Sequence, residues 1–170
     1  MTRHPMWPGS LECSRYPLPL LGMETYQVAA IVVAGVLGLD ALIHAYWMTG
    51  RTWPARDVRT LSQMVLNADV PFTVPVLAPL VLILLGGAGA VLAQAGLVDA
   101  WLPSWLPGWV PTLGALAVAV GTLLRGGAGI VWAFGIGARR DSTFYRLNLI
   151  AYTPMCLLLC GASTLVFVGG

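Results

Sequence analysis

The chain has 170 residues, about the length of one domain, and charged residues make up 9% of it, where a soluble domain carries roughly 25%. The AVILMFWYC set makes up 58%, arginine supplies all nine basic charges, and the formal net charge is +2. So few charges cannot cover a water-soluble surface, which excludes a soluble enzyme, a disordered chain and a nucleic-acid-binding protein, and leaves a small integral membrane protein with the lipid bilayer as its partner.

The first 25 residues are predicted to form a tail that precedes a membrane domain over residues 26–170. The tail carries arginines and prolines but lacks the apolar stretch of a signal peptide. Met23, followed by Glu24, offers an alternative start. Residues 1–22 are therefore expected to be either an untranslated extension or a dispensable tail.

Four charge-poor stretches are long enough for spanning helices, which need about 20 apolar residues. We predict helices over about 26–47, 74–96, 111–136 and 147–168. Each span must satisfy its own backbone hydrogen bonds in lipid, and continuous apolar runs favour helices over barrel strands, whose apolar residues alternate. The predicted fold class is an all-α integral membrane four-helix bundle.

Arginine placement predicts the orientation of this bundle, because positively charged loops stay in the cytoplasm. The 48–73 and 137–146 loops together hold six arginines, whereas the 97–110 connector holds none. Both arginine-rich loops are therefore predicted to be cytoplasmic, with both termini outside. The connector instead carries three tryptophans, which are typical of an aromatic belt and which could alternatively form a lid over an outward-facing pocket.

Glycine-rich runs predict how two of these helices pack. The second span carries Gly-Gly-Ala-Gly over residues 86–89, and the third span carries the same sequence over residues 126–129. Glycine lets helix backbones approach closely in lipid. We therefore expect a close contact between the second and third spans near the middle of the membrane.

Polar residues inside the predicted spans mark the candidate site. Asp40 and His44 are four residues apart in the first span, so they share one helix face, and Trp47 continues that face. Arg125 lies about 16 Å inside the third span at 1.5 Å per residue. Four residues recur every four positions in the fourth span and form one polar stripe: Asn148, Tyr152, Cys156 and Cys160.

Asp40 and Arg125 are the charges whose position needs an explanation. An ionised group at the bilayer centre costs at least ~2.5–3.5 kcal/mol on the insertion scale. We therefore expect these two side chains to pair. The pair could be a structural clasp between the first and third spans, or part of a cluster that contacts a substrate, an ion or a proton. In the second case His44 would tune the acid or relay a proton.

Other chemistries find no support in the residue pattern. The chain has two histidines and three cysteines, and their spacing makes neither a haem site nor a zinc site. The glycine runs lie inside spans and follow no strand, so they are not phosphate-binding loops. We expect no metal and no cofactor.

Several motifs resemble those of a family of short actinobacterial membrane proteins catalogued as a domain of unknown function. Residues 44–50 resemble its His-x-Tyr-Trp-x-x-Gly motif, and Arg125 with the following glycines resembles its third-span arginine. Residues 144–157 resemble its Phe-x-x-x-[Asp/Asn] and Tyr-Ser-Pro-x-Cys-Leu signature, with Thr153 in place of serine. The likeness covers about residues 26–165. It implies four spans in a bacterial inner (cytoplasmic) membrane, and it implies no activity.

The first candidate function is a membrane-embedded enzyme that isomerises or cyclises a lipophilic, isoprenoid-like small molecule. Asp40 would be the general acid or base, tuned by His44 and held by Arg125, and Tyr152 completes the predicted catalytic set. Aromatic faces stabilise cations such as those formed in these reactions. The predicted substrate-binding residues are Tyr46, Trp47, Trp132, Asn148 and Cys156.

Two other functions remain open at this stage. A proton-coupled transporter or relay would need to form a homo-oligomer, because four spans are few for a monomer. A non-catalytic subunit or assembly factor would use the glycine-rich and tryptophan-rich surfaces for contacts. A closed cavity at Asp40 would favour the enzyme, a cavity open to one side would favour the transporter, and a tight salt bridge without a cavity would favour the subunit.

Overall fold

The computed structural model describes residues 23–170, and every regular element among them is helical. The long helices are α1 (Thr25–Met48), α3 (Val74–Gln94), α4 (Trp109–Ala133) and α6 (Thr153–Gly169). The short elements are α2 (Val58–Leu66), the 3-10 turn η1 (Asp99–Trp101), α5 (Thr143–Leu147) and the π turn η2 (Asn148–Tyr152). Residues 1–22, most of the predicted tail, lie outside the described part of the chain.

Four apolar helical segments are long enough to cross a membrane, and they confirm the predicted all-α fold with four spans. The segments are Thr25–Met48, Val74–Gln94, Trp109–Ala133 and Thr143–Gly169, the last of which runs through α5, η2 and α6. The fourth span begins four residues before the predicted start, because the side chain of Ser142 accepts a hydrogen bond from the Tyr145 N–H and caps α5. The chain is a multi-pass membrane protein.

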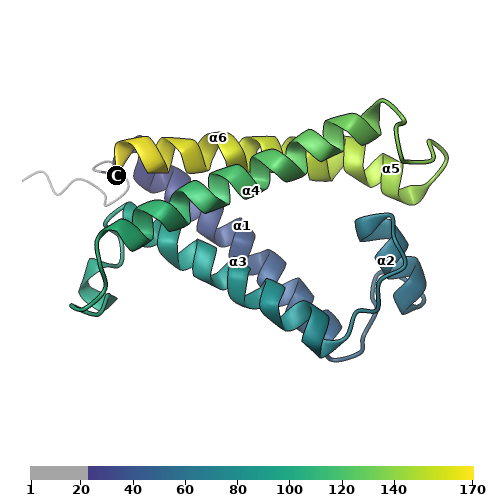
Figure 1. The fold of residues 1–170 in the computed structure, drawn as a ribbon, viewed down its shortest axis with the longest axis horizontal. Helices are drawn as coiled ribbons and strands as arrows, with labels where there is room; N and C mark the ends of the chain where they lie inside the picture. Colours follow the sequence, from purple (N-terminus) through teal and green to yellow (C-terminus); the bar gives the residue numbers. More distant parts are fainter. Residues whose placement is uncertain (1–22) are drawn as a thin grey trace, which may run out of the picture.

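The long helices pack as two pairs, α1 with α3 and α4 with α6 (Figure 1). The pairs meet at the end that holds the C-terminus, and they diverge toward the end that carries α2 and α5 (Figure 1). The two arginine-rich loops lie at the divergent end, and the 95–108 connector lies at the convergent end. The six arginines therefore gather on one side of the bundle.

Small and β-branched side chains fill the core where the two pairs meet. The fully buried members of this core are Ala30, Val33, Val91, Ala115 and Val166. The predicted contact between the second and third spans is formed here, with Gly87 of α3 facing Val118 and Gly114 of α4 facing Ala90.

The second glycine run does not serve that contact. A Cβ added at Gly126 would lie 2.9 Å from a methyl group of Leu157, and one added at Gly129 would meet Thr153. Both partners lie on α6, so these glycines bring α4 against α6 rather than against α3. This corrects the expectation that both runs meet at one interface, and it explains how the α4–α6 pair packs so closely.

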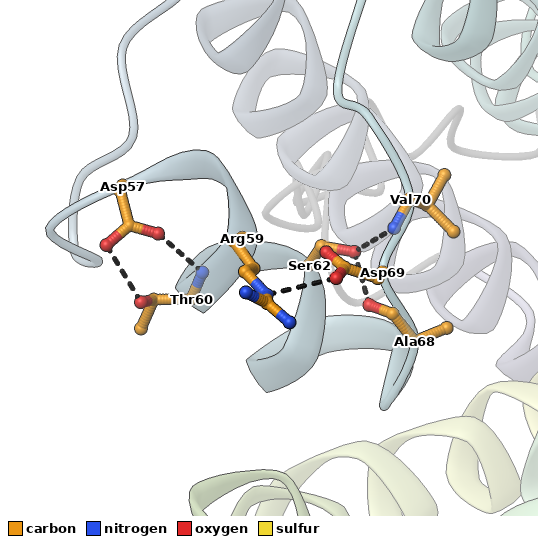
Figure 2. A network of polar contacts seen from close by, with 7 residues as sticks. All are labelled: Asp57, Arg59, Thr60, Ser62, Ala68, Asp69 and Val70. Carbon is orange, nitrogen blue, oxygen red and sulfur yellow. Dashed lines mark hydrogen bonds and ion pairs between the residues drawn. The ribbon is translucent and has the colours of Figure 1, made fainter.

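Helix α2 lies between the first two spans, in a segment that was expected to be a loop. Asp57 begins it by accepting a hydrogen bond of 2.8 Å from the Thr60 N–H, and Asn67 ends it in the left-handed conformation. Ser62 then holds the following segment by donating to the Ala68 carbonyl and accepting from the Val70 N–H (Figure 2). These bonds hold the chain that follows α2 against the helix.

Candidate functional site

Asp40 and His44 lie one turn apart on α1, and their side chains are in contact. Nδ1 of His44 lies 3.3 Å from Oδ1 of Asp40 and 2.8 Å from the backbone oxygen of Asp40. Because a carbonyl oxygen can only accept, Nδ1 carries a proton, which leaves the lone pair of the neutral ring on Nε2. The His44 side chain is 10% exposed and the Asp40 side chain 46%, so the carboxylate is the accessible member of the pair.

Both residues line a cavity of about 550 Å³ that is open on one side. Five residues of the predicted site belong to its wall: Asp40, His44, Tyr46, Trp47 and Tyr152. Six further wall residues were not predicted: Leu42, Ile43, Trp53, Pro54, Val65 and Met155. The volume is in the range of small-molecule sites, which are concave, mostly apolar and equipped with a few polar groups.

The cavity opens beside apolar side chains of the spanning helices. Leu42 and Ile43 on α1 and Met155 on α6 all line it, and all are exposed on the surface of the bundle. Exposed apolar side chains within a membrane span are suited to contact lipid, so we expect the cavity to be accessible from the hydrocarbon. The arrangement suits a molecule that partitions into the bilayer.

Trp47 connects the cavity to the loop that follows α1. Its indole N–H donates a 3.0 Å hydrogen bond to the backbone oxygen of Trp53, and its ring packs against His44 and Phe72, with centroids 5.0 and 5.5 Å apart. This bond folds the loop back over the cavity. Nothing in the local sequence pattern predicts this fold-back, so Trp53 is not among the residues predicted for the site.

Arg125 lies in a second cluster, formed by α4 and η2. Its Nη1 is 3.4 Å from Oδ1 of Asn148, and its Cζ lies 5.0 Å from the ring centre of Trp132 and 5.6 Å from that of Tyr152. Asn148 is fully buried and also donates a 2.8 Å hydrogen bond to the Gly129 carbonyl. The cluster ties α4 to the start of the fourth span.

The expected pairing of Asp40 with Arg125 is wrong. Among the ion pairs that the described residues form, none joins these two side chains. The reason is geometric, because α1 packs mainly against α3 and α6 and not against α4. Each group is satisfied locally: His44 donates to Asp40, and an amide oxygen with two aromatic faces surrounds the guanidinium.

Tyr152 is the residue that the two clusters share, since it lines the cavity and its ring lies beside Arg125. It ends the π turn, in which the Thr153 N–H bonds the Asn148 carbonyl five residues earlier. Pro154, which has no N–H, follows directly and prevents a regular α-helical bond there. Cys156, by contrast, is buried against α4 near Gly126 and is not part of the cavity wall.

Helix α2 supplies Val65 to the cavity, so its stability affects the wall. Hydrogen bonds from the backbone and side chain of Thr60 lower the pKa of Asp57, which is fully exposed (Figure 2). A lowered pKa in the folded state means that this cap stabilises α2 above the usual pKa of aspartate. The contribution is lost as the pH falls through the lowered pKa.

We therefore expect acid to loosen α2 in the natural protein. Hydrogen exchange of the α2 amides, corrected for intrinsic rates, should show protection that falls as Asp57 is protonated. The Asp57→Asn variant keeps a capping oxygen that does not titrate in this range, so its α2 should lose less protection over the same pH range. Equal acid sensitivity in both proteins would contradict this role of the cap.

The whole candidate site lies in a segment of the chain that matches one known protein family. A family described as "Protein of unknown function (DUF3995)" matches the chain over residues 37–163. No curated protein and no solved structure matches it. The matched segment contains the cavity wall and the Arg125 cluster.

Proposed function

The chain belongs to the DUF3995 family, whose description names no activity, so we propose a function from the cavity itself. The protein binds a lipophilic small molecule in this cavity and carries out acid–base chemistry on it. The observation that carries this proposal is the Asp40–His44 contact in a cavity wall that is otherwise mainly apolar and aromatic. Isomerisation or cyclisation of an isoprenoid-like molecule is the reaction class that uses both features.

In the proposed reaction the substrate gains one proton and loses another. The protonated Asp40 carboxyl donates its proton to a carbon–carbon double bond and leaves a carbocation. The ring faces of Tyr46, Trp47 and Tyr152 stabilise this cation. A neighbouring carbon then loses a proton to Nε2 of His44 or to the Asp40 carboxylate, and a double bond forms in a new position. The substrate and product have the same composition.

Arg125 takes a different role from the one that the sequence predicts. It does not contact Asp40, but its guanidinium lies beside the ring of Tyr152 and bonds Asn148. We therefore assign it to positioning: it holds Tyr152 at the cavity wall. Trp132 and Asn148 support it there and do not themselves line the cavity.

Solvent deuterium provides a test that works before the substrate has been identified. The protein, in nanodiscs with a mixture of unsaturated isoprenoids, is incubated in D₂O, and the lipids are analysed by mass spectrometry. The natural protein should produce isomers in which one hydrogen is replaced by deuterium. Asp40→Asn should lower the rate at which these isomers form by about 10²–10⁴-fold, the usual contribution of a general acid. Asp69→Asn removes an exposed carboxylate that pairs with Arg59 away from the cavity and should have no effect. Unchanged labelling in Asp40→Asn would refute the reaction.

Proton-coupled transport of the same kind of molecule is the second candidate. Transport is favoured by the open side of the cavity, which is the outcome expected above for a transporter, and by the divergence of the two helix pairs at the α2 and α5 end (Figure 1). We place the chemistry first because the Asp40–His44 contact lies in a mainly apolar and aromatic wall. Reconstituted vesicles with a pH gradient separate the two functions. Flux that depends on His44 without deuterium labelling would identify a transporter, whereas labelling without flux would identify the enzyme.

A further inference from the structure

We infer that the cavity selects lipophilic molecules that carry a single positive charge and rejects anions of the same shape. The inference rests on the proposed function for the location of the site and does not depend on the reaction. It follows from the charges in the wall, from its aromatic lining and from its apolar mouth, each of which restricts the ligand in a different way.

The wall contains one carboxylate and no arginine, and the chain contains no lysine. Asp40 receives one hydrogen-bonded contact from the described side chains, that of His44, whose Nδ1–H is shared with the Asp40 backbone oxygen. With a neutral imidazole and an ionised carboxyl, the state that follows proton donation in the proposed reaction, the pair carries one negative charge. A cationic ligand would neutralise this charge, and an anionic ligand would be repelled by it.

The other ring systems in the wall strengthen the preference. Tyr46, Trp47, Trp53 and Tyr152 all line the cavity, and aromatic faces attract cations placed within about 6 Å of the ring centre. One donor of the wall is occupied, because the indole N–H of Trp47 is bonded to the Trp53 carbonyl.

Arg125 is outside the wall, where its Nη1 bonds Asn148 and its guanidinium lies beside the rings of Trp132 and Tyr152. None of its N–H donors belongs to the cavity lining. The mouth beside Leu42 and Met155 is apolar, so the remainder of the ligand must be hydrophobic. A carbocation and a stable lipophilic cation satisfy the same requirements.

Tetraphenylphosphonium and tetraphenylborate are a matched pair of probes, because they have nearly the same shape and opposite charges. Binding of each is measured by equilibrium dialysis against the full chain in uncharged detergent micelles, with protein-free micelles as the partition blank. The natural protein should bind the phosphonium saturably, and Asp40→Asn should weaken this binding at least tenfold. Asp141→Asn, which removes an exposed carboxylate paired with Arg139, should bind like the natural protein. The borate should show no saturable binding.

Equal saturable affinity for the two ions, or no saturable phosphonium binding to the folded natural protein, would overturn the inference. This comparison uses the unaltered chain, so it decides the matter even if Asp40→Asn fails to fold. Deuterium labelling without a preference for the phosphonium would refute this inference and keep the proposed function. A preference for the phosphonium without labelling would keep the inference and refute the proposed chemistry.

Discussion

Replacing Gly129 by alanine should destabilise the protein by about 1–3 kcal/mol, the usual cost of overpacking a core by one methyl group. A Cβ at this position would meet the hydroxyl of Thr153, and it would lie 3.0 Å from the Thr153 Cβ and 3.1 Å from Oδ1 of Asn148. Neither neighbour can move freely, because Thr153 is β-branched and buried and Asn148 bonds both Gly129 and Arg125. We expect the variant to have a lower melting temperature in micelles, which is measured by tryptophan fluorescence.

Gly127→Ala is the matched control, two residues away on the same helix. A Cβ there would have no atom within 4 Å, and alanine favours a helix over glycine by roughly 0.5–1 kcal/mol. This variant should melt at the same temperature as the natural protein or slightly higher. If both alanine variants shifted the melting temperature alike, close packing of α4 on α6 at Gly129 would not be the cause.

Asn148→Leu should also destabilise the protein, with an expected loss of about 1.5–3 kcal/mol, the usual value of a hydrogen bond to a charged group. Leucine has nearly the same size but cannot accept from Arg125 or donate to the Gly129 carbonyl. The guanidinium would keep two aromatic neighbours and lose its amide oxygen. Chemical unfolding in micelles measures the loss.

A double variant separates the charged interaction from the packing. Removing both partners of a buried polar pair is far less costly than removing one, so Arg125→Leu combined with Asn148→Leu should recover much of the stability lost by Asn148→Leu. The coupling energy of this cycle should exceed about 0.5 kcal/mol, the lower bound for residues in contact. A double variant as unstable as the sum of the two single variants would show that the two side chains act independently.

The sequence predicted the parts of the fold that depend on distance along the chain. Apolar run length located the four spans to within four residues, because the thickness of the bilayer sets how long each run must be. The spacing of Asp40 and His44 correctly predicted their contact, since helical geometry alone brings residues i and i+4 together. Tyr152, which was predicted to belong to the same catalytic set as Asp40, lines the same cavity.

The sequence failed where the result depends on how helices rotate against one another. Depth indicated that Asp40 and Arg125 could meet, but Gly126 and Gly129 turn α4 toward α6, and Arg125 finds its partners there. Helix α2 was missed because its nine residues lie in an arginine-bearing segment between two spans that was expected to be a loop, although they are strongly amphipathic at the helical period. Its capping residue Asp57 was the signal that could have revealed it.

One property of the fourth span depends on how many residues its π turn contains and not on which residues they are. Five residues, Asn148–Tyr152, form this turn, whereas an α-helix advances about 100° with each residue. Deleting one of residues 149–151 would remove the extra residue and restore a regular helix. Asn148 and Thr153 would then be four residues apart, which keeps them on one face of the helix. Asn148 bonds Arg125 on one side of the deletion, and Thr153 packs on Gly129 on the other. The π turn therefore accommodates one extra residue while both contacts with α4 are kept, whereas a regular α-helix with the same residues would rotate one contact away by about 100°.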